Sequence, residues 1–392
     1  MKLRQMKKIL GSALGLHLLA IVPLVRAQTK SQGFEPALSR VPPVLEMDLR
    51  KHGYRTYLSG GRDSLSLAFT DRNDIVFAWT TVDDSSVDKK IGRLPTAASH
   101  LHALLLDART GRKKDGREWP ASSFYATIHP VGKEKFLICT GKSIQLLSPD
   151  FDVIRVQAIP RSNSCIGGDV SPSRQSFSIN TGVGNNYQPT LFDAESFAPI
   201  AKWSREARGV RFTDTLLVGT CSPQFKLCIR KSNQPWEPFH FAETDEPVRD
   251  NPYKLPFFVN DSILAIVRAG EMAVVTVEGA LLFRVALRNG LGNPATSTGG
   301  ERFALIESKS RGLTNEALDM YAFPSDDHVV VYSLHERMAI YTRKVKGTSP
   351  WSPWVVHRNR LALSPDGTLL AVLDDGMLAV YQLPADASSS TH

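Results

Sequence analysis

The feature that most constrains this 392-residue chain is a recurring unit in which two short apolar segments are joined by a tight polar turn. The clearest copy is RLALSPDGTLLAVLDDGMLAVYQL, at Arg360–Leu383. It contains three apolar segments of strand length and two turns, and helical periodicity is scarce in the rest of the chain. The pattern therefore predicts a small antiparallel sheet at the C-terminal end.

The turns of this copy have residues suited to reversing a chain. The first contains Ser364, Pro365, Asp366 and Gly367, and the second contains Asp375 and Gly376. Proline presets φ, aspartate caps the turn through its side chain, and glycine accepts a positive φ. These residues are fold signatures, and they carry no chemistry of their own.

Looser copies of the unit occur upstream. Their turns lie near residues 71, 130, 172, 214, 261 and 299, followed by the last copy near 366. Most intervals are roughly 40 to 60 residues, the range of propeller blades with loop insertions. The longest interval contains the segment 313–324, for which we predict a loop or a short helix. The fold expected is all-β: a seven-bladed β-propeller of four-stranded antiparallel blades, with six or eight blades as alternatives.

A second recurring element supports this fold. At 104–111 and at 191–196 an apolar segment ends in aspartate and a polar turn, and the next apolar stretch ends in Trp119 or Trp203. This order is typical of the third and fourth strands of a blade. We expect the tryptophans to pack between blades, because propeller sheets bury aromatic side chains between their faces.

Taken together, the Ser-Pro-Asp-Gly turn, the Asp-Gly turn and the Leu-Asp-Ala-like turns resemble those of the bacterial WD-repeat-like β-propellers. The resemblance covers residues 42–384. The Gly-His and Trp-Asp dipeptides of the eukaryotic repeat are absent, so the likeness is to degenerate relatives. It implies the fold and, by analogy, a binding role, but it names no ligand.

The two ends of the propeller region are predicted to meet. The last copy ends after three strands at Pro384, and residues 43–49 form a strand-like segment before the first full copy. Pairing of 43–49 with the last blade would complete it and protect exposed strand edges. The small polar residues of 385–392 predict a disordered tail.

The N-terminus predicts export. Residues 1–27 combine a basic start, an apolar run over 9–25 and the cleavage-site-like triplet Val25-Arg26-Ala27. We expect cleavage between Ala27 and Gln28, a linker over 28–41, and a periplasmic or extracellular protein. An uncleaved membrane anchor is the alternative, and it would be the chain's membrane contact.

Charge argues against a nucleic-acid partner. The formal net charge is +8, but residues 1–27 contain five basic residues and no acidic one. The remainder has 42 basic and 39 acidic residues, a net +3 without the clustered Lys and Arg of a nucleic-acid surface. The expected partner is a protein or a small molecule bound by a propeller face, and the expected state is a monomer.

Four cysteines remain after the predicted cleavage, an even number in an exported chain. Cys221 and Cys228 have the spacing of two strands in one hairpin, and Cys139 would then pair with Cys165 across neighbouring blades. All three connectivities stay open at the level of sequence. No C-x-x-C motif supports a zinc ribbon or a thioredoxin-like centre.

Few residues suggest a reactive site. His100 and His102 would point to one face of a strand, as metal ligands can, but we see no carboxylate or third histidine that completes the set. Asp83, Asp84 and Asp88 are interpreted as an acidic loop, since their order does not match a calcium loop. No nucleotide-binding or nucleophile-elbow motif is present, and no catalytic, cofactor-binding or metal residue is predicted.

The sequence therefore favours an exported, non-enzymatic binding module without a cofactor. The alternative is a propeller hydrolase or lyase acting on a carbohydrate, lactone or peptide, which would need carboxylates or histidines converging at the axis. A quinone-cofactor propeller is a third hypothesis, but its repeated tryptophan motifs are missing.

Overall fold

The computed structural model describes residues 39–54, 65–81, 100–121, 126–140, 143–158, 169–181, 188–203, 207–221, 226–231, 233–242, 256–268, 270–287, 289–310, 324–345, 360–374 and 376–386. The predicted signal peptide, the linker up to residue 38, Asp375 and the tail from 387 onward lie outside the described residues. The described part of the chain contains no helix with the length and apolar character needed to cross a membrane.

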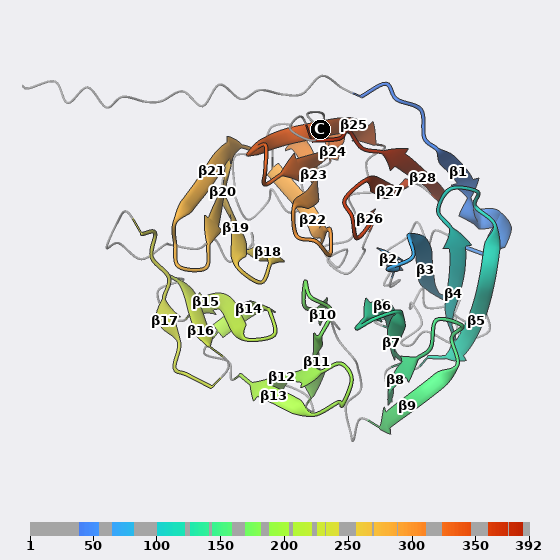
Figure 1. The fold of residues 1–392 in the computed structure, drawn as a ribbon, viewed down its shortest axis with the longest axis horizontal. Coiled ribbons are helices and arrows are strands. Elements are labelled where there is room, and N and C mark those ends of the chain that lie inside the picture. Colours follow the sequence, from blue (N-terminus) through green and yellow to red (C-terminus); the bar gives the residue numbers. More distant parts are fainter. Residues whose placement is uncertain are drawn as a thin grey trace, which may run out of the picture. The chain divides into compact units, whose positions relative to one another are not determined.

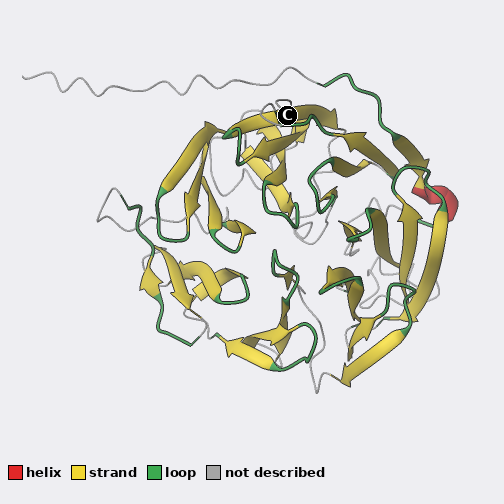
Figure 2. Cartoon of the chain, in the orientation of Figure 1, coloured by secondary structure: helices red, strands yellow, loops and turns green. Residues whose placement is uncertain are grey.

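The described residues form seven four-stranded antiparallel sheets arranged about a common axis, which we call blades I to VII in chain order (Figures 1 and 2). Blade I contains β2 (Leu65–Phe69), β3 (Asp74–Thr81), β4 (His100–Asp107) and β5 (Lys113–Pro120). Blade II contains β6 (Thr127–Val131), β7 (Lys135–Cys139), β8 (Ser143–Leu147) and β9 (Val153–Ala158). Blade III contains β10 (Asp169–Val170), β11 (Ser176–Thr181), β12 (Gln188–Asp193) and β13 (Pro199–Lys202).

The remaining blades follow the same order from axis to rim. Blade IV contains β14 (Ala207–Phe212), β15 (Leu216–Cys221), β16 (Lys226–Lys231) and β17 (Glu237–Pro238), and blade V contains β18 (Phe257–Asn260), β19 (Ile263–Arg268), β20 (Glu271–Thr276) and β21 (Leu281–Ala286). Blade VI contains β22 (Asn289–Thr296), β23 (Arg302–Ser310), β24 (Pro324–Ser333) and β25 (Met338–Val345). Blade VII contains β26 (Leu361–Leu363), β27 (Leu369–Asp374) and β28 (Met377–Gln382), with β1 (Leu45–Asp48) as its outer strand. The fold is a seven-bladed β-propeller, as the sequence predicted.

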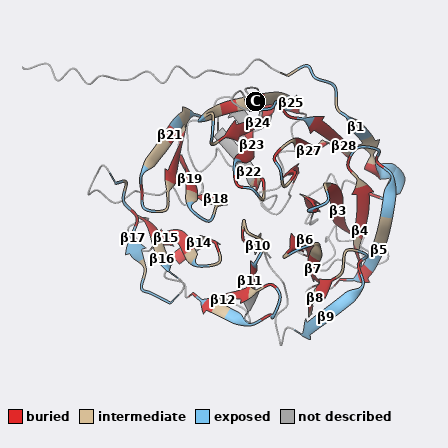
Figure 3. Cartoon of the chain, in the orientation of Figure 1, coloured by how far each residue is buried: buried red, intermediate tan, exposed pale blue. Residues whose placement is uncertain are grey.

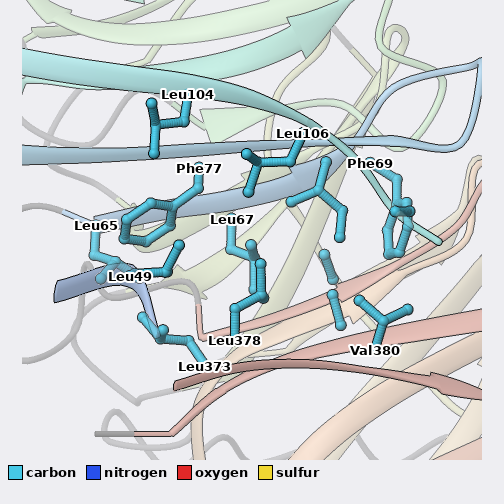
Figure 4. Packing of buried hydrophobic residues seen from close by; sticks show 14 of the residues in the cluster. Leu49, Leu65, Leu67, Phe69, Phe77, Leu104, Leu106, Leu373, Leu378 and Val380 are labelled. Atoms are coloured by element: carbon cyan, nitrogen blue, oxygen red, sulfur yellow. The ribbon is translucent and has the colours of Figure 1, made fainter. Parts of the chain in front are cut away.

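Apolar residues lie between the blades. Among the described residues, buried apolar side chains form seven clusters, and each joins two neighbouring blades. Figure 4 shows the cluster between blades VII and I, where Leu67 of blade I lies next to Leu378 of blade VII. Because both faces of a blade are covered, a middle strand such as β3 is apolar at successive positions. The outer strands are the more exposed ones, as in β5, β9 and β17 (Figure 3).

The ends of the propeller are joined by the N-terminal strand. The sequence placed this strand over 43–49, and β1 pairs with β28 so that Leu45 lies opposite Val380 and Asp48 opposite Met377. Before β1 the chain contacts blade VI, where the Ser39 amide donates to the Thr342 carbonyl at 2.8 Å. The closing segment therefore contacts both of the last two blades.

A side-chain oxygen supports the turn between the first two strands of most blades. In the described turns these residues are Thr70, Ser171, Thr213, Asn260, Ser297 and Ser364, each accepting a backbone N–H from two to five residues later. In blade VII, Ser364 accepts from the Leu369 amide at 2.8 Å, and Gly367 has a φ of +69°. The repeated turn is thus a local hydrogen-bonded unit, which is why it could be read from the sequence.

The aspartate turns of blades I and III are equivalent to each other. Asp107 accepts from the backbone and hydroxyl of Thr110, and Asp193 accepts in the same way from Ser196. These hydrogen bonds hold the pKa of both carboxyls below the ordinary value.

Blade VI accounts for the longest interval in the repeat. Of the segment 313–324 predicted as a loop or short helix, residues 313–323 lie outside the described residues, and Pro324 begins β24. Its first strand, β22, has the sequence NGLGNPAT, and its register shifts between Leu291 and Ala295. Glycine and proline have low strand propensity, which explains why this copy looked poor in the sequence.

A disulfide joins Cys221 of β15 to Cys228 of β16, with the two Cα atoms 5.9 Å apart. Cys139 is also disulfide-bonded. Its predicted partner, Cys165, lies outside the described residues, so the Cys139–Cys165 pairing stays a prediction.

Candidate ligand site in the axial cavity

The first strands of the blades surround a cavity of about 220 Å³ at the centre of the propeller. Residues from β2, β6, β10, β14, β18, β22 and β26 all line it. We call this space the axial cavity. It is the place where equivalent positions of different repeats face a common volume.

One layer of the axial cavity is made of structurally equivalent residues. In each blade the layer residue pairs with the third residue of the second strand. From blade I to blade VII these residues are Ala68, His129, Asp169, Arg211, Phe257, Ala295 and Ala362. All of them line the axial cavity.

The layer is divided by chemistry. Blades II, III and IV contribute His129, Asp169 and Arg211, which we call the polar sector. Blades V, VI, VII and I contribute one phenylalanine and three alanines, which we call the apolar sector. In the apolar sector each layer residue packs in the cluster shared with the next blade, as Phe257 does with blade VI.

Two members of the polar sector form an ion pair across the boundary between blades III and IV. The Arg211 Nη1 atom donates to Asp169 Oδ2 at 2.6 Å. The side chains retain 24% and 42% of their exposure, so the pair stands at the cavity surface and is not sealed in the core. Arg211 has five N–H donors and a carboxylate has two oxygens, so both groups have further bonding capacity on the cavity side.

His129 is the third member. Its Nε2 atom is enclosed, and among the described residues it has no hydrogen-bond partner. Burial lowers the pKa of His129, and the nearby negative charge of Asp169 opposes that shift only in part. The imidazole is therefore neutral at pH 7, with a nitrogen that can donate or accept depending on its tautomer.

Arg174 also lines the axial cavity, but its charge is already compensated. This residue of blade III reaches to blade I, where Nη1 contacts Asp71 at 2.8 Å and Nη2 donates to the Phe69 carbonyl at 3.0 Å. Its own backbone has a φ of +64° in the tight turn. Arg174 thus links two blades, and its side chain is 13% exposed.

A serine network stands behind the polar sector. Ser171, Ser173 and Ser176 of blade III donate their hydroxyls to the carboxylate of Asp214 in blade IV, at 2.6 to 2.9 Å. Ser171 and Ser176 are buried. The network fixes blade III against blade IV at the point where Asp169 meets Arg211.

No family model matches the chain, and no curated protein matches it. Among solved structures it is similar to KlHsv2 with loop 6CD replaced by a Gly-Ser linker, at 12% identity and a TM-score of 0.49, covering 83% of this chain and 95% of that one.

Two further structures have the same level of similarity. A chain of the mitotic checkpoint complex has 12% identity and a TM-score of 0.47, covering 89% of this chain and 98% of that one. A functionally unknown protein from Desulfotomaculum acetoxidans has 11% identity and a TM-score of 0.47, covering 72% and 91%. The blades themselves agree with the WD-repeat-like resemblance at the level of fold.

The sequence candidates for a metal site are His100 and His102, and they lie on β4 at the rim side of blade I, away from the axial cavity. A carboxylate that the sequence did not indicate lies beside them, since Glu118 on the paired strand β5 comes within 3.5 and 3.2 Å of their ring nitrogens. The His102 ring also stacks on Trp79 and contacts Thr81.

These contacts are those of a hydrogen-bonded strand pair. Burial lowers the pKa of His102, with Glu118 acting against that shift. In the described ranges, no three His, Cys, Asp or Glu side chains are grouped so as to hold a metal ion. Asp83, Asp84 and Asp88 lie outside the described residues.

The sequence alone did not identify the polar sector. Asp169 and Arg211 lie inside the third and fourth copies of the repeat, where they counted as fold residues, and His129 ends a strand of the second copy. A signal did exist: aligning the copies by their first turn places these three polar residues at a position that is apolar in the other four.

Proposed function

We propose that this chain is an exported, non-enzymatic binding module whose small ligand occupies the axial cavity. The observation that carries this proposal is the Asp169–Arg211 pair, which lines the axial cavity while its side chains stay 42% and 24% exposed. Both groups keep unused hydrogen-bonding capacity at the cavity surface, which a small polar ligand can satisfy.

The size of the axial cavity indicates a small ligand. Drug-sized ligands occupy roughly 300 to 1,000 Å³, whereas an apolar cavity of about 150 Å³ takes up benzene. At about 220 Å³, the axial cavity matches one ring or a branched chain with a polar substituent.

Export is supported by two independent features. Residues 1–27 have the composition of a secretory signal. The Cys221–Cys228 disulfide is the kind of bond that persists in oxidising compartments. The proposed location is periplasmic or extracellular.

A hydrolase or lyase is the second candidate, because a neutral histidine beside a carboxylate could act as a general base. Two contacts favour binding over catalysis. The Asp169 carboxylate is engaged by Arg211, and the hydroxyl of Ser171, the nearest serine along β10 and its turn, donates to Asp214. A serine nucleophile would need its hydroxyl hydrogen-bonded to the histidine that acts as the base.

The test fills the cavity. Ala68→Phe places a ring in the axial cavity, and Ala198→Phe makes the same change on an exposed turn of blade III. The exported protein is screened by ligand-observed NMR against a set of one-ring acids, amines, amides and amino acids. We expect hits with the parent and with Ala198→Phe, and their loss with Ala68→Phe.

Thermal unfolding checks that Ala68→Phe is folded, since overpacking costs about 1–3 kcal/mol. An absence of hits with the parent, or hits that survive Ala68→Phe, would refute a ligand in the axial cavity. If the protein converts any hit to a product, it is an enzyme and the non-enzymatic proposal is wrong. A protein bound on a propeller face, the other mode open from the sequence, would be insensitive to both variants.

A further inference from the structure

The polar sector contains a donor and an acceptor of opposite charge side by side at the cavity wall. Arg211 contacts Asp169 through Nη1 alone, and Asp169 contacts Arg211 through Oδ2 alone, among the described contacts. A ligand can therefore bind both groups without breaking their pair. It must present an acceptor to Arg211 and a donor to Asp169 Oδ1.

The charges around the axial cavity balance. Arg211 is compensated by Asp169 at 2.6 Å, and Arg174 is compensated by Asp71 at 2.8 Å. His129 is neutral because burial lowers its pKa. A ligand with a net charge would leave one charge unpaired in a partly enclosed site, which is costly, whereas a ligand of zero net charge would not.

The order of the polar sector sets the orientation of such a ligand. In the apolar sector the layer residue of each blade packs toward the next blade, and the Asp169–Arg211 pair follows the same rule. The charge of Asp169 influences the pKa of His129 in blade II, which places the two residues near each other. In the layer Asp169 stands between His129 and Arg211, and Arg211 stands between Asp169 and Phe257.

The wall outside the polar sector suits an apolar body. Phe257 and Phe258 of blade V, Ala295 of blade VI and Leu361 of blade VII also line the axial cavity. An aromatic or branched aliphatic group is the natural partner for this surface, because it removes apolar area from water on both sides.

We propose that the axial cavity binds a free α-amino acid with an apolar side chain, its carboxylate on Arg211 and its ammonium on Asp169. This assignment rests on the proposed function, since it names the ligand class of the same cavity. The ammonium supplies the N–H donor that Asp169 Oδ1 can accept. The side chain lies against Phe257.

The experiment separates the two charges of the ligand. L-phenylalanine, 3-phenylpropanoate and phenethylamine are titrated calorimetrically into the exported protein at pH 7.5. They share the ring and differ in having both charges, the carboxylate alone, or the ammonium alone. We expect L-phenylalanine to bind about tenfold or more tightly than either of the others, because each loses one charged hydrogen-bonding group.

Asp169→Asn tests the ammonium contact. We expect it to remove most of the preference for L-phenylalanine over 3-phenylpropanoate. The matched control is Asp152→Asn. Asp152 lies on an exposed turn of blade II and pairs with Arg117 of blade I, so this substitution should leave all three affinities unchanged.

The outcomes distinguish the two proposals. If ring compounds bind and Ala68→Phe abolishes their binding, but L-phenylalanine is no tighter than 3-phenylpropanoate or phenethylamine, the amino-acid assignment is wrong and the cavity site stands. If the preference survives Asp169→Asn, the assigned ammonium contact is wrong. If none of the three ring compounds binds the parent protein while other compounds of the NMR screen do, the amino-acid assignment is wrong and the cavity site stands. An absence of every hit overturns both proposals.

Discussion

The polar sector and the apolar sector occupy one layer of one cavity, at backbone positions with the same strand register. In the apolar sector the layer residue belongs to the core between blades, as Ala362 does at 5% exposure. In the polar sector it forms an ion pair or has an unpartnered nitrogen. The comparison teaches that the propeller backbone accommodates both charged and apolar side chains at this position.

The largest expected effect comes from placing polar-sector chemistry in the apolar sector. Ala362→Asp buries a carboxylate in the apolar cluster between blades VII and I. We expect a loss of about 3–5 kcal/mol in the free energy of unfolding, measured by urea denaturation, because the charge is uncompensated. Ala198→Asp on an exposed turn should stay within about 0.5 kcal/mol. Equal losses at the two sites would contradict the distinction between the sectors.

The next effect concerns the support behind the polar sector. Asp214→Ala removes the acceptor of three serine hydroxyls, two of which are buried. We expect a loss of about 2–3 kcal/mol in the same urea measurement, since hydrogen bonds to charged groups are the stronger ones. Asp152→Ala, which breaks an exposed pair with Arg117, should cost less than about 1 kcal/mol. A loss for Asp214→Ala no larger than this control would show that the network does not hold blades III and IV together.

His129 should make the stability of the protein depend on pH. Its pKa is lower in the native state than the ordinary value of 6.5, so the unfolded state takes up the proton first as the pH falls. Below pH 6.5 the parent should lose up to about 1.4 kcal/mol per pH unit relative to His129→Leu, until the native pKa is reached. Urea unfolding of both proteins at pH 7.5, 6.5 and 5.5 measures the difference, and parallel pH profiles would contradict a buried neutral imidazole.

The smallest effect is that of the ion pair itself. A double-mutant cycle with Asp169→Ala and Arg211→Met should give a coupling energy of about 0.5–1 kcal/mol, because both side chains remain partly exposed and solvent screens them. The coupling should fall in 1 M salt. A coupling of several kcal/mol that salt does not change would mean that the pair is sealed from water and closed to a ligand.

The sequence by itself determined the fold because the fold depends on local features. The turns at Ser364–Gly367 and its relatives are held by hydrogen bonds within five residues, so each copy shows its own chemistry. The apolar run of β3 and the three-stranded last copy likewise follow from burial between blades. Where local propensity is weak, as in the Gly- and Pro-containing β22, the copy was hard to recognise.

The site was decided only by the tertiary structure. His129, Asp169 and Arg211 lie about forty residues apart in successive repeats, and nothing in their neighbours marks them as partners. Closure of the propeller brings the first strands to one axis and places equivalent positions around one cavity. The sequence thus determined where the chain turns and which faces are buried, while strand register and closure decided which polar side chains meet, because such contacts exist only between distant parts of the chain.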